Sequence, residues 1–511
     1  MNYSIGPTRQ ASAVLHAAYA ALLCALLAGC NVGPKYLPPA MTAPTAFKES
    51  PDQFREMDGW KVAQPQDAGL RGRWWEIYNE PQLNALEDQL NIDNQNIRQA
   101  FENFMEARAL VREARSQYFP TVGVGGSYTR SQTSSNVGAA STTGASSGQQ
   151  TQAFSLPADV SWEPDLWGRV RNTVRASQYS AQLSAADLEN ERLTEQASLA
   201  EFFFEIRGQD ALGKLLGDTV EADRKALQIA KARYDTGVDD QITVVEAQTA
   251  LDSAQSAAIN LGIARAQYEH AIATLIGKPA STFSIPAEPK TTAPPPIPVG
   301  LPSQLLERRP DIAAAERNMA AANAQIGVAF AAFFPALTLS ATPGFESSAL
   351  KSLFDWPSRF WSVGPSISET VYDGGLRRAT VNQYIATYNA NVAAYRQSVL
   401  NAFQQVEDSL AAVRILSQQI LRQQESVKSS QTFLRLELGR YDTGIDPYID
   451  VVTAQTTLLA NQQSLTNLQV QEMTASVQLI ESLGGGWDRS QLPTPAQVTQ
   501  KPSKPEAAIQ H

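Results

Sequence analysis

The strongest constraint on the fold of this chain is an internal repeat. Residues 233–251, RYDTGVDDQITVVEAQTAL, align without a gap with residues 440–458, RYDTGIDPYIDVVTAQTTL, and 13 of the 19 pairs are identical at an offset of 207. Upstream, Tyr118-Phe119-Pro120 resembles Phe333-Phe334-Pro335. The 511 residues therefore contain two tandem copies of one unit.

The two copies are predicted to span residues 79–278 and 302–485, joined by a Pro-rich linker at 279–301. The offset of 207 still holds near their ends, where Ile276-Gly277 matches Leu483-Gly484. Each copy should have the same order of elements: a helix, a β-hairpin, a long helix, a tip and a return helix.

The predicted hairpins lie at 120–163 and 335–370. After Phe119-Pro120, where proline ends the preceding helix, apolar residues alternate with Gly, Ser and Thr. The alternation resumes after a Ser/Thr/Gly-rich stretch at 131–152. The apolar positions include Val122, Val124, Tyr128, Phe154, Leu156, Ala158, Val160 and Trp162, then Leu337, Leu339, Ala341, Trp361, Val363 and Ile367. Strands of about ten residues with one apolar face match a transmembrane hairpin. A soluble hairpin is the alternative, but aromatic residues near the strand ends favour the membrane.

Two stretches without proline, 165–278 and 366–446, are rich in Ala, Gln, Glu and Leu, which favour helix. A helix over 168–234 would be about 100 Å long at 1.5 Å per residue. The tips at 233–242 and 440–449 should reverse each long helix into a return helix, with a glycine ending the first helix.

The N-terminus predicts a lipoprotein. Residues 1–29 contain Arg9, an apolar run over 11–27 and small residues before Cys30, as in a secretory signal with a bacterial lipobox. A transmembrane anchor is the alternative. We expect covalent lipid on Cys30, no other cofactor, and a linker over 30–78. Position 31 is Asn31. In similar lipoproteins an aspartate at this position would favour retention in the inner membrane, so outer-membrane sorting is expected.

Composition excludes several functions. The net charge of −10 without a basic patch argues against nucleic acid as a partner. The three histidines lie far apart, at 16, 270 and 511, and the cysteines at 24 and 30 cannot form a CxxC site. No nucleophile elbow is present. We therefore predict no catalytic residue, no metal site and no enzyme.

Two hairpins supply four strands, whereas known transmembrane barrels have about eight or more. Strand edges cannot be left open in lipid. Several copies of the chain must therefore share one barrel.

A group of motifs, weak singly but specific together, carries a family resemblance. They are Leu27-Ala-Gly-Cys30, Trp74-Trp75, LERRPDI at 306–312, AANAQIGV at 321–328 with Phe333-Phe-Pro335, both RYDTG tips, and Leu483-Gly-Gly-Gly-Trp487. The chain resembles TolC-like outer-membrane efflux proteins over nearly its whole mature length. Specifically, it resembles the NodT-type lipoprotein branch, which serves resistance-nodulation-division (RND) pumps.

The resemblance implies an α+β fold in a homotrimer. Four strands per chain would form a 12-stranded transmembrane β-barrel continuous with a long α-helical barrel in the periplasm. Residues 30–78, 279–301 and the tail 486–511 would form an equatorial belt. The location would be the cell outer membrane, with outer-membrane lipid as a partner and a lipid anchor.

The implied function is the outer-membrane channel of a tripartite efflux system. It would pass drugs or other small molecules from an RND inner-membrane pump and a periplasmic adaptor (membrane fusion) protein to the exterior. The alternative within this class is a type I protein secretion duct.

The resemblance also indicates a periplasmic constriction at the second tip, with Tyr441 and Asp450 in family positions. Asp446, Asp450 and Thr453 have i, i+4, i+7 spacing and are expected on one helical face. In a trimer, three Asp450 carboxylates would form a ring that favours cations. The alternative is an ordinary acidic helix start.

The sequence departs from the family at Thr243, where relatives have an acid that partners the tyrosine, so the closed-state latch should be weaker or built differently. The adaptor-facing tip residues are predicted to be Asp235, Thr236, Gly237, Asp442, Thr443 and Gly444. A capping role is the alternative for the Asp and Thr residues among them.

Overall fold

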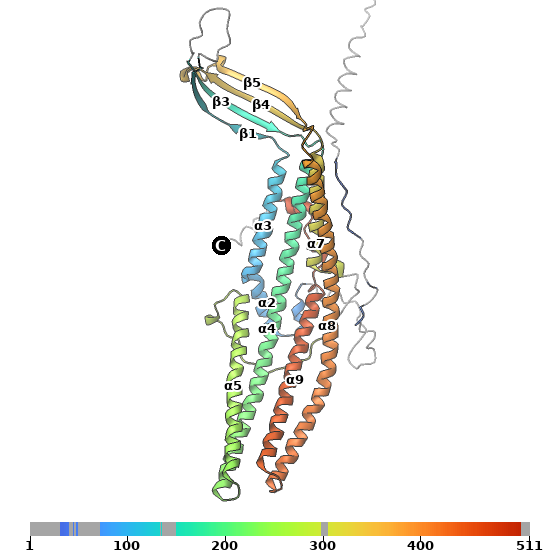
Figure 1. Cartoon of the computed structure of the whole chain (residues 1–511). Coiled ribbons are helices and arrows are strands. Elements are labelled where there is room, and N and C mark those ends of the chain that lie inside the picture. Colours follow the sequence, from blue (N-terminus) through green and yellow to red (C-terminus); the bar gives the residue numbers. More distant parts are fainter. Residues whose placement is uncertain are drawn as a thin grey trace, which may run out of the picture.

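The computed structural model describes residues 31–39, 44, 47–49, 72–132, 134, 150–297 and 305–501. The predicted signal peptide, Cys30 and most of the stretch 131–152 lie outside these residues. The described chain is elongated, with a small sheet at one end and two helical hairpins at the other (Figure 1).

The two helical hairpins have the same dimensions. Helices α4 (Arg169–Asp235) and α8 (Leu376–Asp442) have 67 residues each, and α5 (Gln241–Leu275) and α9 (Tyr448–Ser482) have 35 each. Each bound in the second hairpin lies 207 positions after its counterpart. The sequence repeat therefore continues through both hairpins without insertion or deletion. Figure 1 shows α5 and α9 beside the lower parts of α4 and α8.

Shorter helices precede α4 and α8 in the chain. They are α2 (Pro81–Asp93), α3 (Gln95–Ser116), α6 (Leu305–Arg308) and α7 (Pro310–Ala331). Helix α3 packs on α4, and α7 packs on both α4 and α8. Half of the buried residues of α7 are alanine, and small side chains allow close approach to two neighbours.

The sheet is four strands wide. Strands β1 (Thr121–Val124) and β2 (Ser127–Gln132) both pair with β3 (Gln150–Trp162), which pairs with β4 (Ala336–Ser347), and β4 pairs with β5 (Arg359–Ser368). All pairs are antiparallel. The sequence predicted one continuous strand where the structure has β1 and β2. The interruption falls at Gly125-Gly126, and Gly125 N still donates to Pro157 O at 3.1 Å.

Strand register places like residues in rows across the sheet. One row joins Val122, Val160, Ala341 and Val363, and the adjacent row joins Thr121, Ser161, Ser340 and Gly364. One face is therefore apolar and the other is lined by small polar side chains. The apolar face has no covering element among the described residues, and Trp361 on it is 77% exposed.

The largest hydrophobic core lies near the middle of the molecule. Trp74 and Phe203 are fully buried there, and side chains of α2, α4, α5 and α9 surround them. Trp74 belongs to the 3₁₀ turn η2 (Trp74–Tyr78). The remaining short elements are η3 (Ala280–Thr282), η5 (Leu350–Ser352), η6 (Trp356–Ser358), η7 (Arg489–Gln491) and α10 (Pro495–Thr499).

The two linkers bind equivalent positions of the repeat. Arg207 of α4 pairs with Glu288 at 3.1 Å, and Arg414 of α8, 207 positions later, pairs with Glu49 at 2.7 Å. Ile285 and Phe47 beside these acids are both buried. The N-terminal segment therefore binds copy two as the inter-copy linker binds copy one. Among the described helices, none is both long enough and apolar enough to cross a membrane.

Candidate functional site

The candidate site is formed by the two turns that join the long helices to the return helices. Gly237 and Gly444 both have φ of 72°, a left-handed conformation that glycine adopts without strain. Val238 N donates to Arg233 O, and Ile445 N donates to Arg440 O, both at 2.9 Å. These bonds satisfy the last carbonyl groups of α4 and α8.

Each turn also contains an arginine and an aspartate six residues apart. Arg233 Nε lies 2.9 Å from Asp239 Oδ2, and Arg440 Nη2 lies 2.9 Å from Asp446 Oδ1. The arginine of the second turn is more exposed, with 53% of its side chain accessible against 27% for Arg233. The repeat therefore produces the same ion pair twice, in different surroundings.

Tyr441 connects the two turns. Its hydroxyl donates to Asp239 Oδ2 at 2.7 Å, and its ring lies under the guanidinium of Arg233, 4.7 Å from Cζ to the ring centroid. This geometry combines a charge-assisted hydrogen bond with a cation–π contact. The acceptor of the Tyr441 hydroxyl is thus Asp239, which was not among the predicted site residues.

A second tyrosine packs against the first. Tyr441 and Tyr448 have ring centroids 5.3 Å apart, in a core with Leu227, Leu251 and Val451. Burial raises the pKa of Tyr441, and its hydrogen bond to Asp239 raises it further. Burial also raises the pKa of Tyr448 to about 12, but its buried hydroxyl has no hydrogen-bond partner among the described residues.

The second turn gathers three carboxyl groups. Single oxygen atoms of Glu437, Asp446 and Asp450 lie within 4.8 Å of one another. The guanidinium of Arg440 lowers the pKa of Asp446, whereas desolvation and the neighbouring Asp446 raise that of Glu437. These oxygen atoms are spaced closely enough to hold a cation, although exposed acidic groups commonly lack one. No metal site was predicted from the sequence, and Glu437 was not among the predicted site residues.

The structure corrects one part of the predicted constriction. Asp446 does not share a helical face with Asp450 and Thr453, because α9 begins at Tyr448 and Pro447 before it is extended. Asp450 lies in the first turn of α9, where a carboxylate is favoured. The Thr453 hydroxyl donates to Ile449 O at 2.8 Å, so it is bonded within its own helix.

The remaining predicted tip residues lie at the ends of α4 and α8. The hydroxyl groups of Thr236 and Thr443 donate to carbonyl groups of the preceding helix, at 3.0 Å for each bond. These contacts agree with the capping alternative for the threonines. Asp235 and Asp442 are exposed and make no hydrogen bond to any described residue. Their side chains are free to contact another protein.

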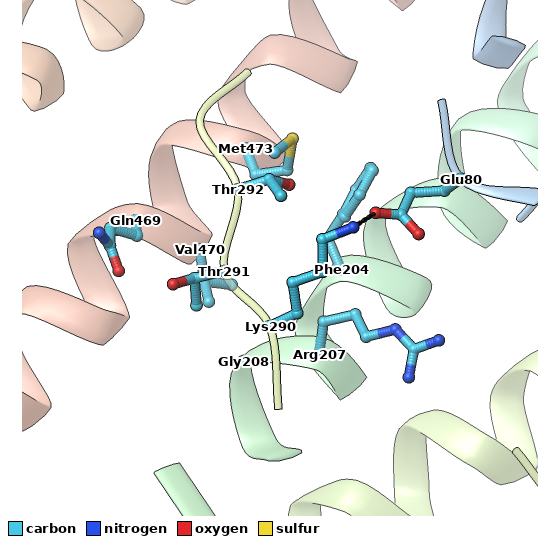
Figure 2. Close-up of a pocket in the computed structure, with 10 residues that line it drawn as sticks. All are labelled: Glu80, Phe204, Arg207, Gly208, Lys290, Thr291, Thr292, Gln469, Val470 and Met473. Carbon is cyan, nitrogen blue, oxygen red and sulfur yellow. Dashed lines mark hydrogen bonds and ion pairs between the residues drawn. The ribbon is translucent and has the colours of Figure 1, made fainter. Parts of the chain in front are cut away.

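A small cavity is present near the middle of the molecule. It lies where residues 290–292 cross α4 and α9, and Lys290 Nζ pairs there with Glu80 Oε1 at 2.9 Å (Figure 2). Its volume of about 20 Å³ suits a single water molecule. The cavity belongs to the junction between linker and helices.

Comparison with known proteins decides the family. The family described as "Outer membrane efflux protein" matches residues 86–278 and 301–485, which together are more than half of the chain. The chain belongs to the outer membrane efflux protein family. Each matched range falls on one copy of the repeat.

Curated relatives agree over almost their full length. The chain is 32% identical over 477 residues to the solvent efflux pump outer membrane protein SrpC of Pseudomonas putida, covering 91% of this chain and 97% of the relative. It is 31% identical over 489 residues to outer membrane protein OprJ of Pseudomonas aeruginosa, covering 92% and 95%.

Solved structures show the same fold. The outer-membrane channel OprN superimposes with a TM-score of 0.80 at 27% identity, covering 90% of this chain and 100% of that one. The open state of the MtrE outer membrane channel of Neisseria gonorrhoeae gives 0.76 at 25% identity, covering 90% and 99%. The predicted fold class is confirmed.

The family membership confirms the predicted function. The chain is the outer-membrane channel component of an efflux system, and its location is the outer membrane. The family is a transport family.

Proposed function

We propose that three copies of this chain close one 12-stranded barrel in the outer membrane and conduct small molecules through it. The observation that carries this proposal is the sheet. Its apolar face is uncovered, and its outer strands β1, β2 and β5 have no partner on one side among the described residues. Lipid cannot satisfy such edges, so they require neighbouring copies.

The channel works with a periplasmic adaptor protein and an RND inner-membrane pump. The exposed Asp235 and Asp442 at the tips are the proposed adaptor contacts. The exported compounds are drugs or organic solvents. This choice follows relatives named as antibiotic, toluene and solvent efflux pump proteins.

A lipid on Cys30 anchors the chain at the inner leaflet. The residues that follow Cys30 support this position, because they bind the start of α4. Val32 N donates to Trp167 O at 3.2 Å, and Asn172 Nδ2 donates to Asn31 Oδ1 at 3.1 Å. Cys30→Ser should abolish acyl labelling and retain the signal peptide. Lipid on that variant would contradict the anchor but not the barrel.

Native mass spectrometry of the detergent-extracted protein tests the assembly, and a trimer is expected. A stable folded monomer would refute the shared barrel. Drug and solvent susceptibility of a deletion strain tests transport, with the intact gene restored as the control. If susceptibility to every compound tried is unchanged and no adaptor is recovered on pull-down, the proposed exported compounds and the proposed adaptor and pump partners are refuted.

A further inference from the structure

A basic cavity lies just below the sheet. It has a volume of about 580 Å³ and is bordered by the end of α3, the start of α4 and the C-terminal α10. Its polar lining comes mainly from Arg115, Tyr118, Arg171, Arg175 and Gln178. A cavity of this size can hold a lipid headgroup.

Positive charge in this cavity exceeds its local compensation. Arg171 pairs with Asp165, Nε to Oδ2 at 3.0 Å. Arg175 makes only a long hydrogen bond of 3.5 Å to Asn172, and Arg115 makes none to a described residue. Burial and then the Asp165 carboxylate raise the pKa of Tyr118, and the three guanidinium groups oppose that rise. Three arginines therefore line one cavity, with Asp165 as the acid that acts on Tyr118 beside them.

Helix α3 carries two further arginines beside the cavity, on the side away from the sheet. Arg108, Arg112 and Arg115 have i, i+4, i+7 spacing and share one face. Arg108 Nη2 donates to Gln500 O at 2.9 Å, on the C-terminal side of the cavity. Arg112 Nη1 is buried without a hydrogen-bond partner among the described residues. Such a donor is costly unless something accepts its hydrogen bond.

Apolar surface begins directly above the cavity. Phe119 and Val122, which follow Tyr118, are 68% and 67% exposed, and Val122 belongs to the apolar face of the sheet. Trp162 Nε1 donates to Tyr118 O at 3.1 Å, so an indole lies at the same level. Aromatic residues with one apolar and one polar end are typical of the membrane–water interface.

We propose that this cavity binds the headgroup of an anionic phospholipid of the inner leaflet, with its acyl chains along Phe119 and the apolar face of β1. A phosphodiester supplies acceptors for Arg115 and Arg175, and a basic pocket at the interface suits anionic lipid. The site goes beyond the transport function and does not depend on which compound is exported.

Copy two lacks this site. The positions equivalent to Arg115 and Tyr118, 215 residues later, are Phe330 and Phe333, and the position equivalent to Arg175, 207 residues later, is Asn382. Only Arg171 has a basic counterpart, Arg378. Each chain should therefore bind one such lipid.

The test is native mass spectrometry of the detergent-extracted full chain titrated with phosphatidylglycerol or phosphatidylcholine. The R115Q/R175Q variant should bind phosphatidylglycerol at least tenfold more weakly, with binding of phosphatidylcholine unchanged. R115K/R175K keeps the charge and should retain most of the binding. The matched control is R422Q/R435Q, which removes two exposed arginines of α8 away from the sheet.

Two further measurements separate a lipid site from a simple anion site. Soluble glycerophosphoglycerol, which has no acyl chains, should bind at least tenfold more weakly than phosphatidylglycerol. Phe119→Ser should weaken the binding of phosphatidylglycerol but not the binding of glycerophosphoglycerol. Equal binding of the soluble compound would overturn the lipid assignment. Undiminished phosphatidylglycerol binding by R115Q/R175Q, or equal loss in R422Q/R435Q, would overturn the site itself.

Discussion

The two tips of this chain have the same backbone but different partners. In the first tip the ion pair of Arg233 and Asp239 is covered by Tyr441, which is 8% exposed. In the second tip the pair of Arg440 and Asp446 has no such cover, and Tyr234, the repeat counterpart of Tyr441, is 46% exposed. Duplication produced the same local geometry twice. Packing within the chain covers the ion pair of the first tip and leaves the ion pair of the second tip exposed.

Removing the covering ring should have the largest effect. Tyr441→Ala deletes a buried ring, its hydrogen bond and its cation–π contact, at a cost of about 3 kcal/mol in local opening free energy. Tyr234→Ala, at the equivalent exposed position, should cost less than about 0.5 kcal/mol. Hydrogen exchange at the tip amides measures both. Equal protection in the two variants would remove the proposed asymmetry.

The two aspartates should differ next. Asp239→Asn weakens bonds to both Arg233 and Tyr441 and should cost about 2 kcal/mol, since hydrogen bonds to charged groups are the stronger ones. Asp446→Asn affects a solvent-screened pair and should cost clearly less than Asp239→Asn. Planar-bilayer recording should show higher conductance only for Asp239→Asn. A larger change in Asp446→Asn would place the latch at the second tip.

The two packed tyrosines, Tyr441 and Tyr448, should respond differently when their hydroxyl groups are removed. Tyr441→Phe loses the bond to Asp239 and should destabilise the closed tip by about 1 kcal/mol. Tyr448→Phe removes a buried hydroxyl that has no described partner and should be neutral or stabilising. Hydrogen exchange at neutral pH compares the two variants. Destabilisation by both would mean that the Tyr448 hydroxyl has an acceptor.

The same pair predicts a pH dependence. The raised pKa of Tyr448 means that the folded tip favours the neutral hydroxyl over the ionised one. The stability of the tip that depends on this neutral form is fully present below pH 10 and is lost as the pH rises through about 12. Tyr448→Phe should reduce the loss of hydrogen-exchange protection at the tip amides between pH 10 and about 12. Tyr441→Phe should still show the share of that loss that ionisation of Tyr448 causes. The same alkaline loss in wild type and Tyr448→Phe would assign it to another group.

The smallest structural effect is expected at Asp450, where only ion selectivity should change. Asp450→Ala should lower cation selectivity in bilayers, because a threefold set of carboxylates attracts cations. Its repeat counterpart Thr243 provides the control, and Thr243→Ala should leave selectivity unchanged. If selectivity survives in Asp450→Ala, the trio partners Glu437 and Asp446 are the next candidates.

The fold was largely predictable because its signals are local or repeated. Alternation defined the strands, the absence of proline defined the long helices, and Gly237 and Gly444 located the tips. The interruption at Gly125-Gly126 was not predicted, because glycine fits the polar positions of an alternating strand as well as a break.

The tip contacts were less predictable because they depend on packing between the two copies. Asp239 and Asp446 are identical in the repeat, each six residues after an arginine, and this spacing was the available signal. Nothing local shows that Tyr441 packs against the first copy while Tyr234 does not. Asp446 was misplaced because Pro447 delays the start of α9, and helical spacing does not apply before a helix begins.

The offset between the copies changes only once, and this has a consequence for protein engineering. It is 215 from α3 to α7 and 207 from α4 to α8, so the difference arises between the paired strands. One residue inserted into α4 or α5 would turn the later side chains of that helix by about 100° and advance them by about 1.5 Å. The two helices of the hairpin would then be out of register with each other. A peptide tag placed between β4 and β5 would leave both helical hairpins at equal length. That connection is therefore the place to add an affinity handle or a fluorophore while preserving the channel.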